Sequence, residues 1–533
     1  MPSLPRRARG RNRRRVAGPA RMNGSLTRSA LWLMAAKTVA FTLAFALPLV
    51  LVRHLSQTGF GLYKQLFLLV GSAMTILPLG FVMSGFYFLP RHPTRRPHVA
   101  FNILLFYVAV SGLAALLLLW RPTILETLFH DPTLAALSGP IAILVFLMVA
   151  FSFLELIALA DADVRAASLL IVVMNLTKMV LLVGAAFVFA SFEALVYAAI
   201  VQGLLQAAVL LWYLTTRFPG FRRGPDWPLM RAQLVYAIPL GTAAILSVVQ
   251  GDLPSFFIAH YFDAATYAVY AVGCFQLPFL SILSESVGSV MIPAVSRLKL
   301  EDKASDIVQL SARLMRVLAA LYLPLCVFLL VAGREFLTVL FTVRYIDSWP
   351  IFAINLALVP LSILTSVSDP VLRAYPAYIP WLLRLRVIIL GVLAIGAWLA
   401  ASHLLLVWAV VVVVAVNALD RVVLAVVLGR ALNVSWHHFP LLADVGKLAG
   451  AAAVAGLAAA AARGLVGGAG PLAVLATSAA VFGAVYPLAV LALGVPTPTE
   501  RTAARAQVER LLQRCGLRRS PPALRGIRGE EAP

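Results

Sequence analysis

The sequence predicts an all-α, polytopic membrane protein with about fourteen transmembrane helices. Its 533 residues are 61% hydrophobic and only 12% charged, with a mean hydropathy of +0.92, whereas a soluble protein carries about 25% charged residues. The apolar residues gather into long runs, each sufficient to cross ~30 Å of hydrocarbon as a helix. A membrane β-barrel would show ~10-residue segments of alternating hydrophobicity instead.

Each predicted span is one apolar run, and there are fourteen such runs. Very short connections separate the fifth run from the sixth and the eleventh from the twelfth, so twelve or thirteen helices are the alternative. The runs cover residues 29–52, 65–89, 99–120, 139–160, 167–190, 192–215, 234–259, 267–293, 313–332, 350–372, 381–402, 404–429, 446–466 and 471–494. The basic segment before the first run resembles the start of a signal peptide, but the run is too long for one, so we expect an uncleaved first helix.

The distribution of positive charge predicts the orientation. If the N-terminus is cytoplasmic, 36 of the 44 Lys and Arg residues lie in the two tails, in the even-numbered loops or in the span ends next to those loops, and 6 lie in or next to the odd-numbered loops. Cytoplasmic loops carry such an excess. We therefore expect a multi-pass protein of the inner (cytoplasmic) membrane with both termini in the cytoplasm.

The two tails, 1–28 and 495–533, are strongly basic and contribute to a net charge of +22. Two interpretations compete, nucleic-acid binding and attachment to anionic lipids of the inner leaflet. Because no nucleic-acid-binding motif accompanies the tails, we expect lipid attachment and no nucleic-acid partner.

A weak internal repeat divides the chain. Residues 51–91 and 257–297 share a helix end with a His, a polar turn, a Tyr and then a helix that contains Gly and Pro, at an offset of 206 to 207 residues. Chance similarity between apolar segments is the alternative. Parallel repeats build two lobes around a central cavity. We predict lobes at 29–215 and 234–429, a cytoplasmic linker at 216–233, and two added helices in 430–494.

The motifs of the repeat resemble those of Wzx-type polysaccharide flippases, which share a superfamily with multidrug (MATE) exporters and lipid II flippases. The stretches "HYFDAATYAVYAV" (260–272) and "MIPAVSRL" (291–298) are similar to the seventh and eighth helices of that family, and "TGFGLYKQ" (58–65) to the matching turn of the first lobe. The chain departs from the usual Gly-x-Tyr at 268–270, where it has Ala-x-Tyr. The resemblance implies that helices 1, 2, 7 and 8 line the cavity.

Ionisable residues within spans are candidate functional residues. Lys37 either faces an internal cavity or extends to the headgroups. Arg53 and Lys64 flank the first outer turn and either anchor the interface or form the mouth of a cationic path. Lys178 lies midway along the fifth run, and we expect it to be buried or to face the cavity, with Glu155 as a candidate partner.

The second half contributes acids. Asp252 lies between Gly251 and Pro254, which predicts a locally opened helix, and it is either functional or part of an ion pair. Glu285 lies among four serines, so its face of the helix is expected to meet water or protein. Asp369 and Arg373 are four residues apart and predict an ion pair.

Together these charges suggest a substrate with an anionic head. The predicted substrate-binding residues are Lys37, Arg53, Lys64, Lys178, Asp252 and Glu285. Lys and Arg can hold phosphates, so the cations favour a polyprenyl-diphosphate-linked oligosaccharide, which the resemblance also implies. The acids either couple transport to H+ or Na+ or balance the lysines.

No catalytic motif competes with transport. The sequence has no P-loop and no H-E-x-x-H zinc motif, its three cysteines suggest neither a disulfide framework nor a metal site, and we expect no cofactor. A glycan polymerase or ligase would need a large outer loop, and the sequence has none. Glycan polymerases and glycosyltransferases are instead expected as partners of the transporter. A MATE-type cation-coupled drug antiporter and a lipid II flippase remain the alternatives.

Overall fold

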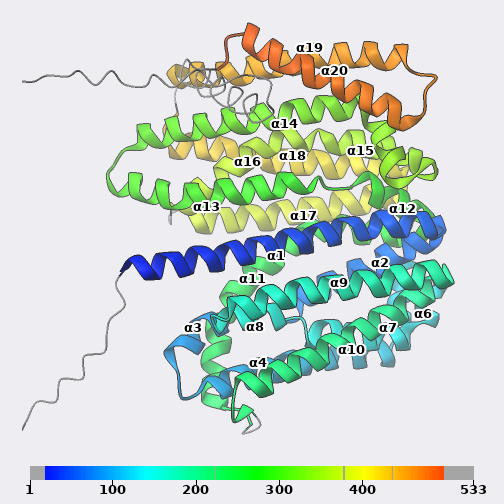
Figure 1. The fold of residues 1–533 in the computed structure, drawn as a ribbon, viewed down its shortest axis with the longest axis vertical. Helices are drawn as coiled ribbons and strands as arrows, with labels where there is room; N and C mark the ends of the chain where they lie inside the picture. Colours follow the sequence, from blue (N-terminus) through cyan, green and yellow to red (C-terminus); the bar gives the residue numbers. More distant parts are fainter. Residues whose placement is uncertain (1–18, 222–223, 376–377, 435, 497–533) are drawn as a thin grey trace, which may run out of the picture. The chain divides into compact units, whose positions relative to one another are not determined.

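A computed structural model describes residues 19–221, 224–375, 378–434 and 436–496 (Figure 1). Within these ranges every regular element is a helix. Eleven helices are long and apolar enough to cross a membrane, and two further pairs, each bent by 40°, raise the number to thirteen. The all-α polytopic fold class is therefore confirmed. The basic segments 6–15 and 501–528 lie outside the described residues.

The predicted eighth span, 267–293, is divided in the structure. α12 (Ala264–Gly273) and α13 (Pro278–Leu300) are separated by residues 274–277. Proline has no N–H and disfavours helical backbone at the residue before it, so α13 begins at Pro278 and does not continue α12. Neither α12, of 10 residues, nor α13, of 23, is among the candidate spans, so the eighth of the fourteen predicted runs has no counterpart among the thirteen.

The predicted second span, 65–89, is also divided. α2 (Gln57–Ile76) ends before Pro78, and α3 (Met83–Arg91) begins after a turn in which Leu79 and Gly80 have φ of 50° and 66°. A Cβ on Gly80 would lie 3.0 Å from the Cα of Gly241, so the turn needs glycine for its backbone conformation and for this close approach.

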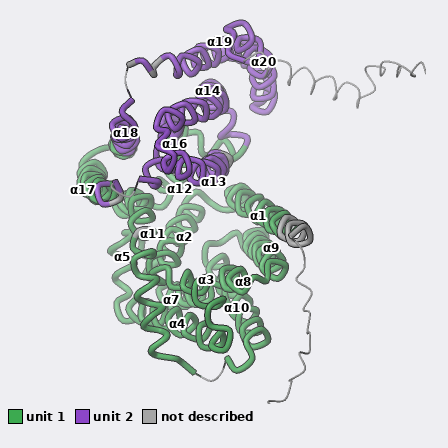
Figure 2. Tube along the Cα trace, turned by 90° about the vertical axis from the view of Figure 1, so that its left-hand side faces the viewer, with its two compact units in different colours: residues 1–278, 340–351, 382–416 green, residues 279–339, 352–381, 417–533 purple. Residues whose placement is uncertain are grey.

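The chain folds into two compact units (Figure 2). Unit 1 comprises residues 1–278, 340–351 and 382–416, and unit 2 comprises 279–339, 352–381 and 417–533. The predicted lobes, linker and added helices follow other boundaries and stay predictions.

Unit 1 contains the N-terminal helices. Their core consists of interlocked side chains such as Phe81, Ile103, Phe153 and Ile157, all buried, and such van der Waals packing drives helix association in lipid. Its further helices are α1 (Pro19–His54), α4 (Arg96–Trp120), α5 (Thr123–Phe129), α6 (Pro132–Ala136), α7 (Ser138–Ala150), α8 (Leu154–Ala160), α9 (Val164–Phe189), α10 (Phe192–Arg217), α11 (Trp227–Tyr261) and the 3-10 helix η2 (Val343–Ser348), with most of α17 (Ile379–His403) and the start of α18 (Leu406–Ala431).

A buried polar network holds the start of α11 in unit 1. The amide of Asn102 on α4 donates to Gln233 Oε1 (2.9 Å), and the Gln233 amide donates to Ser84 Oγ on α3 (3.0 Å). Asn102 also exchanges hydrogen bonds with the backbone of Asp226, the N-cap of α11. Three helices are thus joined by amide groups whose hydrogen bonds are satisfied, as a low-polarity interior requires.

Unit 2 consists of α13, nearly all of α14 (Ala304–Phe341), most of α15 (Trp349–Leu356), α16 (Leu358–Arg373), the end of α18, η4 (Trp436–Leu442), α19 (Ala443–Leu465) and α20 (Pro471–Ala492). α19 and α20 pair closely, as Figure 1 shows in orange. Buried Ala455 and Ala459 meet Phe482 where these two helices pack, because small residues allow two helices to approach. The predicted Asp369–Arg373 ion pair is confirmed at 2.6 Å.

The two copies of the predicted repeat begin with the same local geometry. Ser56 caps α2 with φ, ψ of −64°, 162°, and Asp263, 207 residues later, caps α12 with −64°, 164°; each side chain accepts a hydrogen bond from the backbone N–H three residues on. The ring centroids of Phe60 and Tyr63 lie 6.0 Å apart, and those of Tyr267 and Tyr270 lie 5.8 Å apart. This agreement supports the repeat.

The two capped helices, α2 and α12, pack against each other within unit 1. A Cβ on Gly61 would lie 1.7 Å from the carbonyl oxygen of Ala264, so only glycine fits there. Ala268, where the resemblance leads one to expect glycine, is fully buried.

Candidate functional site

Unit 1 contains five of the six predicted site residues. Lys37 and Arg53 lie on α1, Lys64 on α2, Lys178 on α9 and Asp252 on α11. The sixth, Glu285, is an exposed residue of α13 in unit 2, and its membership of the same site stays a prediction.

One face of α2 carries or contacts three of the predicted site residues, Lys64, Lys178 and Asp252. Phe67 and Ser72 follow Lys64 by three and eight residues, which places all three on one side of a helix. The Lys178 ammonium of α9 lies over the Phe67 ring, and the Ser72 hydroxyl donates a hydrogen bond to the Asp252 carboxylate of α11. We call Lys64, Phe67 and Ser72 the α2 face.

Two ammonium groups lie against aromatic rings of α2. Lys64 Nζ lies 5.6 Å from the centroid of the Phe60 ring, and Lys178 Nζ lies 5.0 Å from that of Phe67. Both lysines are half-buried, and among the described residues neither has a carboxylate within ion-pair distance. Aromatic faces stabilise a cation without neutralising it, so both remain able to attract an anion.

The predicted pairing of Lys178 with Glu155 is wrong, because Glu155 lies beside Lys37 instead. Lys37 Nζ is 3.8 Å from Glu155 Oε1 on α8, and the two side chains are 60% and 40% exposed. α1 packs along α9, which brings Lys37 towards α8, whereas Lys178 extends to Phe67. An exposed pair at this distance contributes little stability, so Lys37 can exchange its partner for a substrate anion at small cost.

Asp252 accepts a hydrogen bond from Ser72 Oγ, at 2.6 Å. The locally opened helix expected around it is not found, because α11 continues through residues 251–254. α11 bends instead between Thr242 and Ala244, by 40°, next to Gly241. A Cβ on Gly241 would lie 1.9 Å from the Leu79 carbonyl oxygen. The turn between α2 and α3 therefore contacts α11 directly beside the bend, at a position where only glycine fits.

Arg53 ends α1 with an exposed side chain that donates to the Leu49 carbonyl of its own helix. A second arginine binds the same helix end. Arg344 of η2 donates to the carbonyls of Val52 (3.1 Å) and Leu55 (3.3 Å), at a helix end whose last four carbonyls have no partner within the helix. The end of α1 is therefore capped by Arg344.

Sequence reasoning did not identify Phe67, Ser72 or Arg344. The spacing of Ser72 and Lys64 on one helical face could have indicated Ser72, whereas Phe67 is one of many apolar residues in its run. Within the described residues no three His, Cys, Asp or Glu side chains converge as a metal site would require. The site offers cations on aromatic rings and a carboxylate on a hydroxyl, which suits the binding of an anionic, hydroxyl-rich ligand.

Comparison with known proteins assigns the family. Residues 50–350, more than half of the chain, match the family described as "Polysaccharide biosynthesis protein". The chain belongs to this family. The matched segment includes Arg53, Lys64, Lys178, Asp252 and Glu285, and the resemblance inferred from the sequence is confirmed. A search of curated proteins finds no match.

Solved structures of the same fold come from the superfamily that the sequence suggested. The lipid II flippase MurJ in an inward closed conformation superposes with a TM-score of 0.64 at 10% identity, over 87% of this chain and 98% of that one. An inward-facing MATE-family multidrug transporter gives 0.57 at 13% identity, over 74% and 94%. A transporter of the MOP superfamily from Pyrococcus furiosus gives 0.53 at 12% identity, over 76% and 95%. Family and fold together identify a multi-pass membrane transporter of the flippase type.

Proposed function

We propose that this protein flips a polyprenyl-diphosphate-linked oligosaccharide across the cytoplasmic membrane for polysaccharide biosynthesis. The family match over residues 50–350 carries this proposal. The substrate is moved and not chemically changed, because alternating access needs only rearrangement of helices around a binding site.

The lysines of unit 1 bind the diphosphate in this proposal. Lys64 of α2 and Lys178 of α9 lie over the Phe60 and Phe67 rings of α2, and neither has a carboxylate partner among the described residues. A cation costs about 3 kcal/mol at the centre of a membrane helix, and a dianionic headgroup that crosses at this depth is the reason to keep two of them. Lys37 and Arg53 extend the cationic path along α1.

The acids have a separate role. Asp252, oriented by Ser72, and Glu285 bind sugar hydroxyl groups or the coupling ion, H+ or Na+. A MATE-type antiporter for cationic drugs would use these carboxylates as its main site, and cations outnumber them here. A lipid II flippase would use the lysines in the same way. The proposed flippase and a lipid II flippase therefore differ in the glycan that the lipid carries.

Location and partners follow from the same proposal. Both termini lie in the cytoplasm, which places the basic tails against anionic lipids of the inner leaflet. Membrane lipids surround the protein, and the glycosyltransferases that build the substrate and a glycan polymerase that consumes it are its functional partners.

The test is a flipping measurement with the purified full chain in vesicles. A fluorescent polyprenyl-diphosphate sugar is placed in both leaflets, and a membrane-impermeant reductant quenches what reaches the outer one. We expect quenching beyond the outer half only in vesicles that contain the protein. Uptake of a cationic dye against a proton or sodium gradient, without any flipping of the sugar lipid, would contradict the proposal and support the antiporter.

A further inference from the structure

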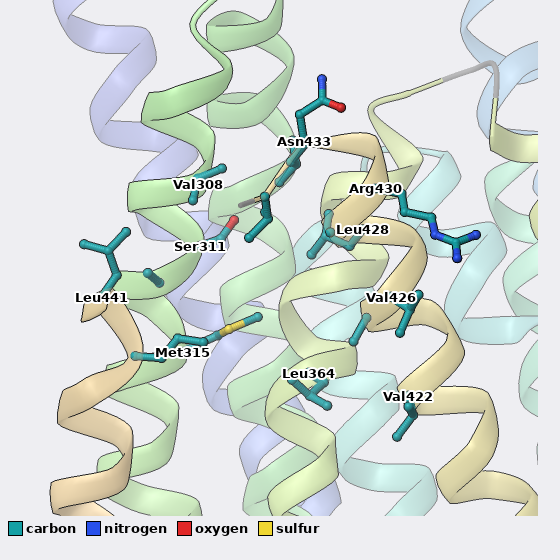
Figure 3. Close-up of a pocket in the computed structure, with 16 residues that line it drawn as sticks. Val308, Ser311, Met315, Leu364, Val422, Val426, Leu428, Arg430, Asn433 and Leu441 are labelled. Carbon is teal, nitrogen blue, oxygen red and sulfur yellow. The ribbon is translucent and has the colours of Figure 1, made fainter. Parts of the chain in front are cut away.

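Unit 2 contains an apolar pocket of about 870 Å³ (Figure 3). Its walls are the first turns of α14, the middle of α16, the last turns of α18 and the end of η4, with side chains such as Met315, Leu364, Val426 and Leu441. Its volume lies at the upper end of the range for small-molecule sites. None of the residues that line it is among those proposed to bind the oligosaccharide lipid.

Polar groups of the pocket gather at one end. Arg430, on the last turn of α18, and Asn433 lie at the rim, and both side chains extend away from the apolar walls in Figure 3. Ser311 lies on the α14 wall; the residue is 5% exposed, and its Oγ has no hydrogen-bond partner. A buried hydroxyl without a partner costs free energy, so a missing acceptor is implied inside the pocket.

We propose that this pocket binds an anionic glycerophospholipid of the surrounding bilayer. The acyl chains fill the space between α14, α16 and α18, and the phosphate binds the Arg430 guanidinium at the rim. The Ser311 hydroxyl donates a hydrogen bond to an ester carbonyl of the lipid. That contact distinguishes the ligand from an isoprenyl phosphate, whose hydrocarbon chain carries no acceptor at this depth.

The proposed orientation of the chain agrees with this ligand, although binding does not depend on it. The start of α14 and the end of α18 both line the pocket, and three cations lie at or next to these helix ends: Lys299 on the last turn of α13, Lys303 just before α14 and Arg430 on the last turn of α18. By the distribution of positive charge these helix ends are cytoplasmic, where anionic phospholipids gather. An anionic phospholipid can therefore reach the rim of the pocket from the cytoplasmic leaflet.

Gly429 offers a way to close the pocket. It lines the cavity, and a Cβ at this position would meet no atom within 4 Å, so we expect the longer side chain of Gly429→Leu to occupy the pocket. Gly450 on α19 also has no atom within 4 Å of a Cβ but lies outside the pocket, so Gly450→Leu is the matched control. Arg430→Gln and Ser311→Ala test the polar contacts, with Arg334→Gln, an exposed arginine elsewhere on α14, as control.

The experiment measures lipid binding to the purified full chain by native mass spectrometry, together with the shift of the apparent Tm on adding lipid. The probes are phosphatidylglycerol, phosphatidylcholine and farnesyl phosphate. We expect phosphatidylglycerol adducts and an upward Tm shift in the wild type and both controls, and a loss of about tenfold or more in affinity in Gly429→Leu and Arg430→Gln. Ser311→Ala should narrow the preference for phosphatidylglycerol over farnesyl phosphate.

Three results would overturn the proposal. These are equal binding of phosphatidylglycerol by Gly429→Leu and the wild type, equal binding of phosphatidylglycerol and phosphatidylcholine, and binding of farnesyl phosphate alone. Because flipping is not measured here, failure of this proposal is distinct from failure of the proposed transport function.

Discussion

Lys178 and Lys64 lie within apolar helices and have no carboxylate partner in the part of the chain that the structure describes. Each ammonium lies over a phenylalanine ring of α2, 5.0 Å and 5.6 Å from the centroid. Such contacts contribute about 0.5–2 kcal/mol, less than the cost of placing the cation at membrane depth. The remaining cost is offset when a phosphate arrives, which makes these two lysines the strongest candidates for substrate contacts.

Asp252 permits a test that separates hydrogen bonding from charge. Asp252→Ala leaves the Ser72 hydroxyl, on a residue 5% exposed, without its acceptor, and we expect a loss of about 1–3 kcal/mol of stability. Asp252→Asn keeps an acceptor oxygen, so its apparent Tm should stay near that of the wild type. Thermal unfolding of the purified variants measures both, and a Tm as low for Asn as for Ala would mean that the charge itself stabilises the fold.

At the level of the helices, the packing of α2 against α12 depends on one glycine. Gly61→Ala would place a Cβ 1.7 Å from the Ala264 carbonyl oxygen, which forces the two helices apart, and overpacking of this kind costs about 1–3 kcal/mol. Gly71→Ala on the same helix meets no atom within 4 Å and should be neutral or stabilising by up to about 1 kcal/mol, because alanine favours helix.

Apparent Tm values of the two variants test this prediction directly. The expected shifts have opposite signs, so a common effect of alanine on α2 cannot produce them. Equal Tm values for Gly61→Ala and Gly71→Ala would mean that α2 and α12 do not meet at Gly61.

Helix existence could be predicted from the sequence, and helix breaks could not. Hydropathy located the apolar runs, and it placed the two short connections at residues 191 and 403, within two residues of the observed connections at 190–191 and 404–405. It missed the breaks before Pro278 and around Leu79–Gly80, because an average over many residues conceals one proline or one pair of left-handed residues. The two capped turns at Ser56 and Asp263 could be aligned, since capping leaves a local signature.

The candidate site was predicted in part for a similar reason. An ionisable residue in an apolar run is visible in the sequence, so Lys64, Lys178 and Asp252 could be named. Their neighbours Phe67 and Ser72 depend on how α2, α9 and α11 pack. Glu155 was assigned to the wrong lysine because sequence position does not reveal that α1 lies along α9.

For the whole molecule, the proposed orientation predicts which helix ends are accessible from outside. Leu300 ends α13 and Leu465 ends α19, and both are highly exposed, at 89% and 88%. In a chain whose three cysteines are replaced, Leu465→Cys should react with an impermeant maleimide on intact cells, and Leu300→Cys only after permeabilisation. The reverse pattern would invert the proposed orientation.

The central claim is that cations on α2 and α9 bind the diphosphate of the lipid-linked oligosaccharide. The most direct measurement is the flipping rate of the fluorescent sugar lipid with the wild type, Lys64→Met, Lys178→Met and the double variant. Lys303→Met is the control, because Lys303 is an exposed loop residue whose ammonium pairs with Glu301 at 2.8 Å. Each lost contact to a charged group is worth about 1.5–3 kcal/mol, or roughly 10- to 100-fold.

We predict single variants slowed by roughly that factor, a double variant without measurable flipping, and a control equal to the wild type. Lys178→Arg, which keeps the positive charge, should retain part of the rate. A double variant that folds and flips the sugar lipid at the wild-type rate would contradict the account.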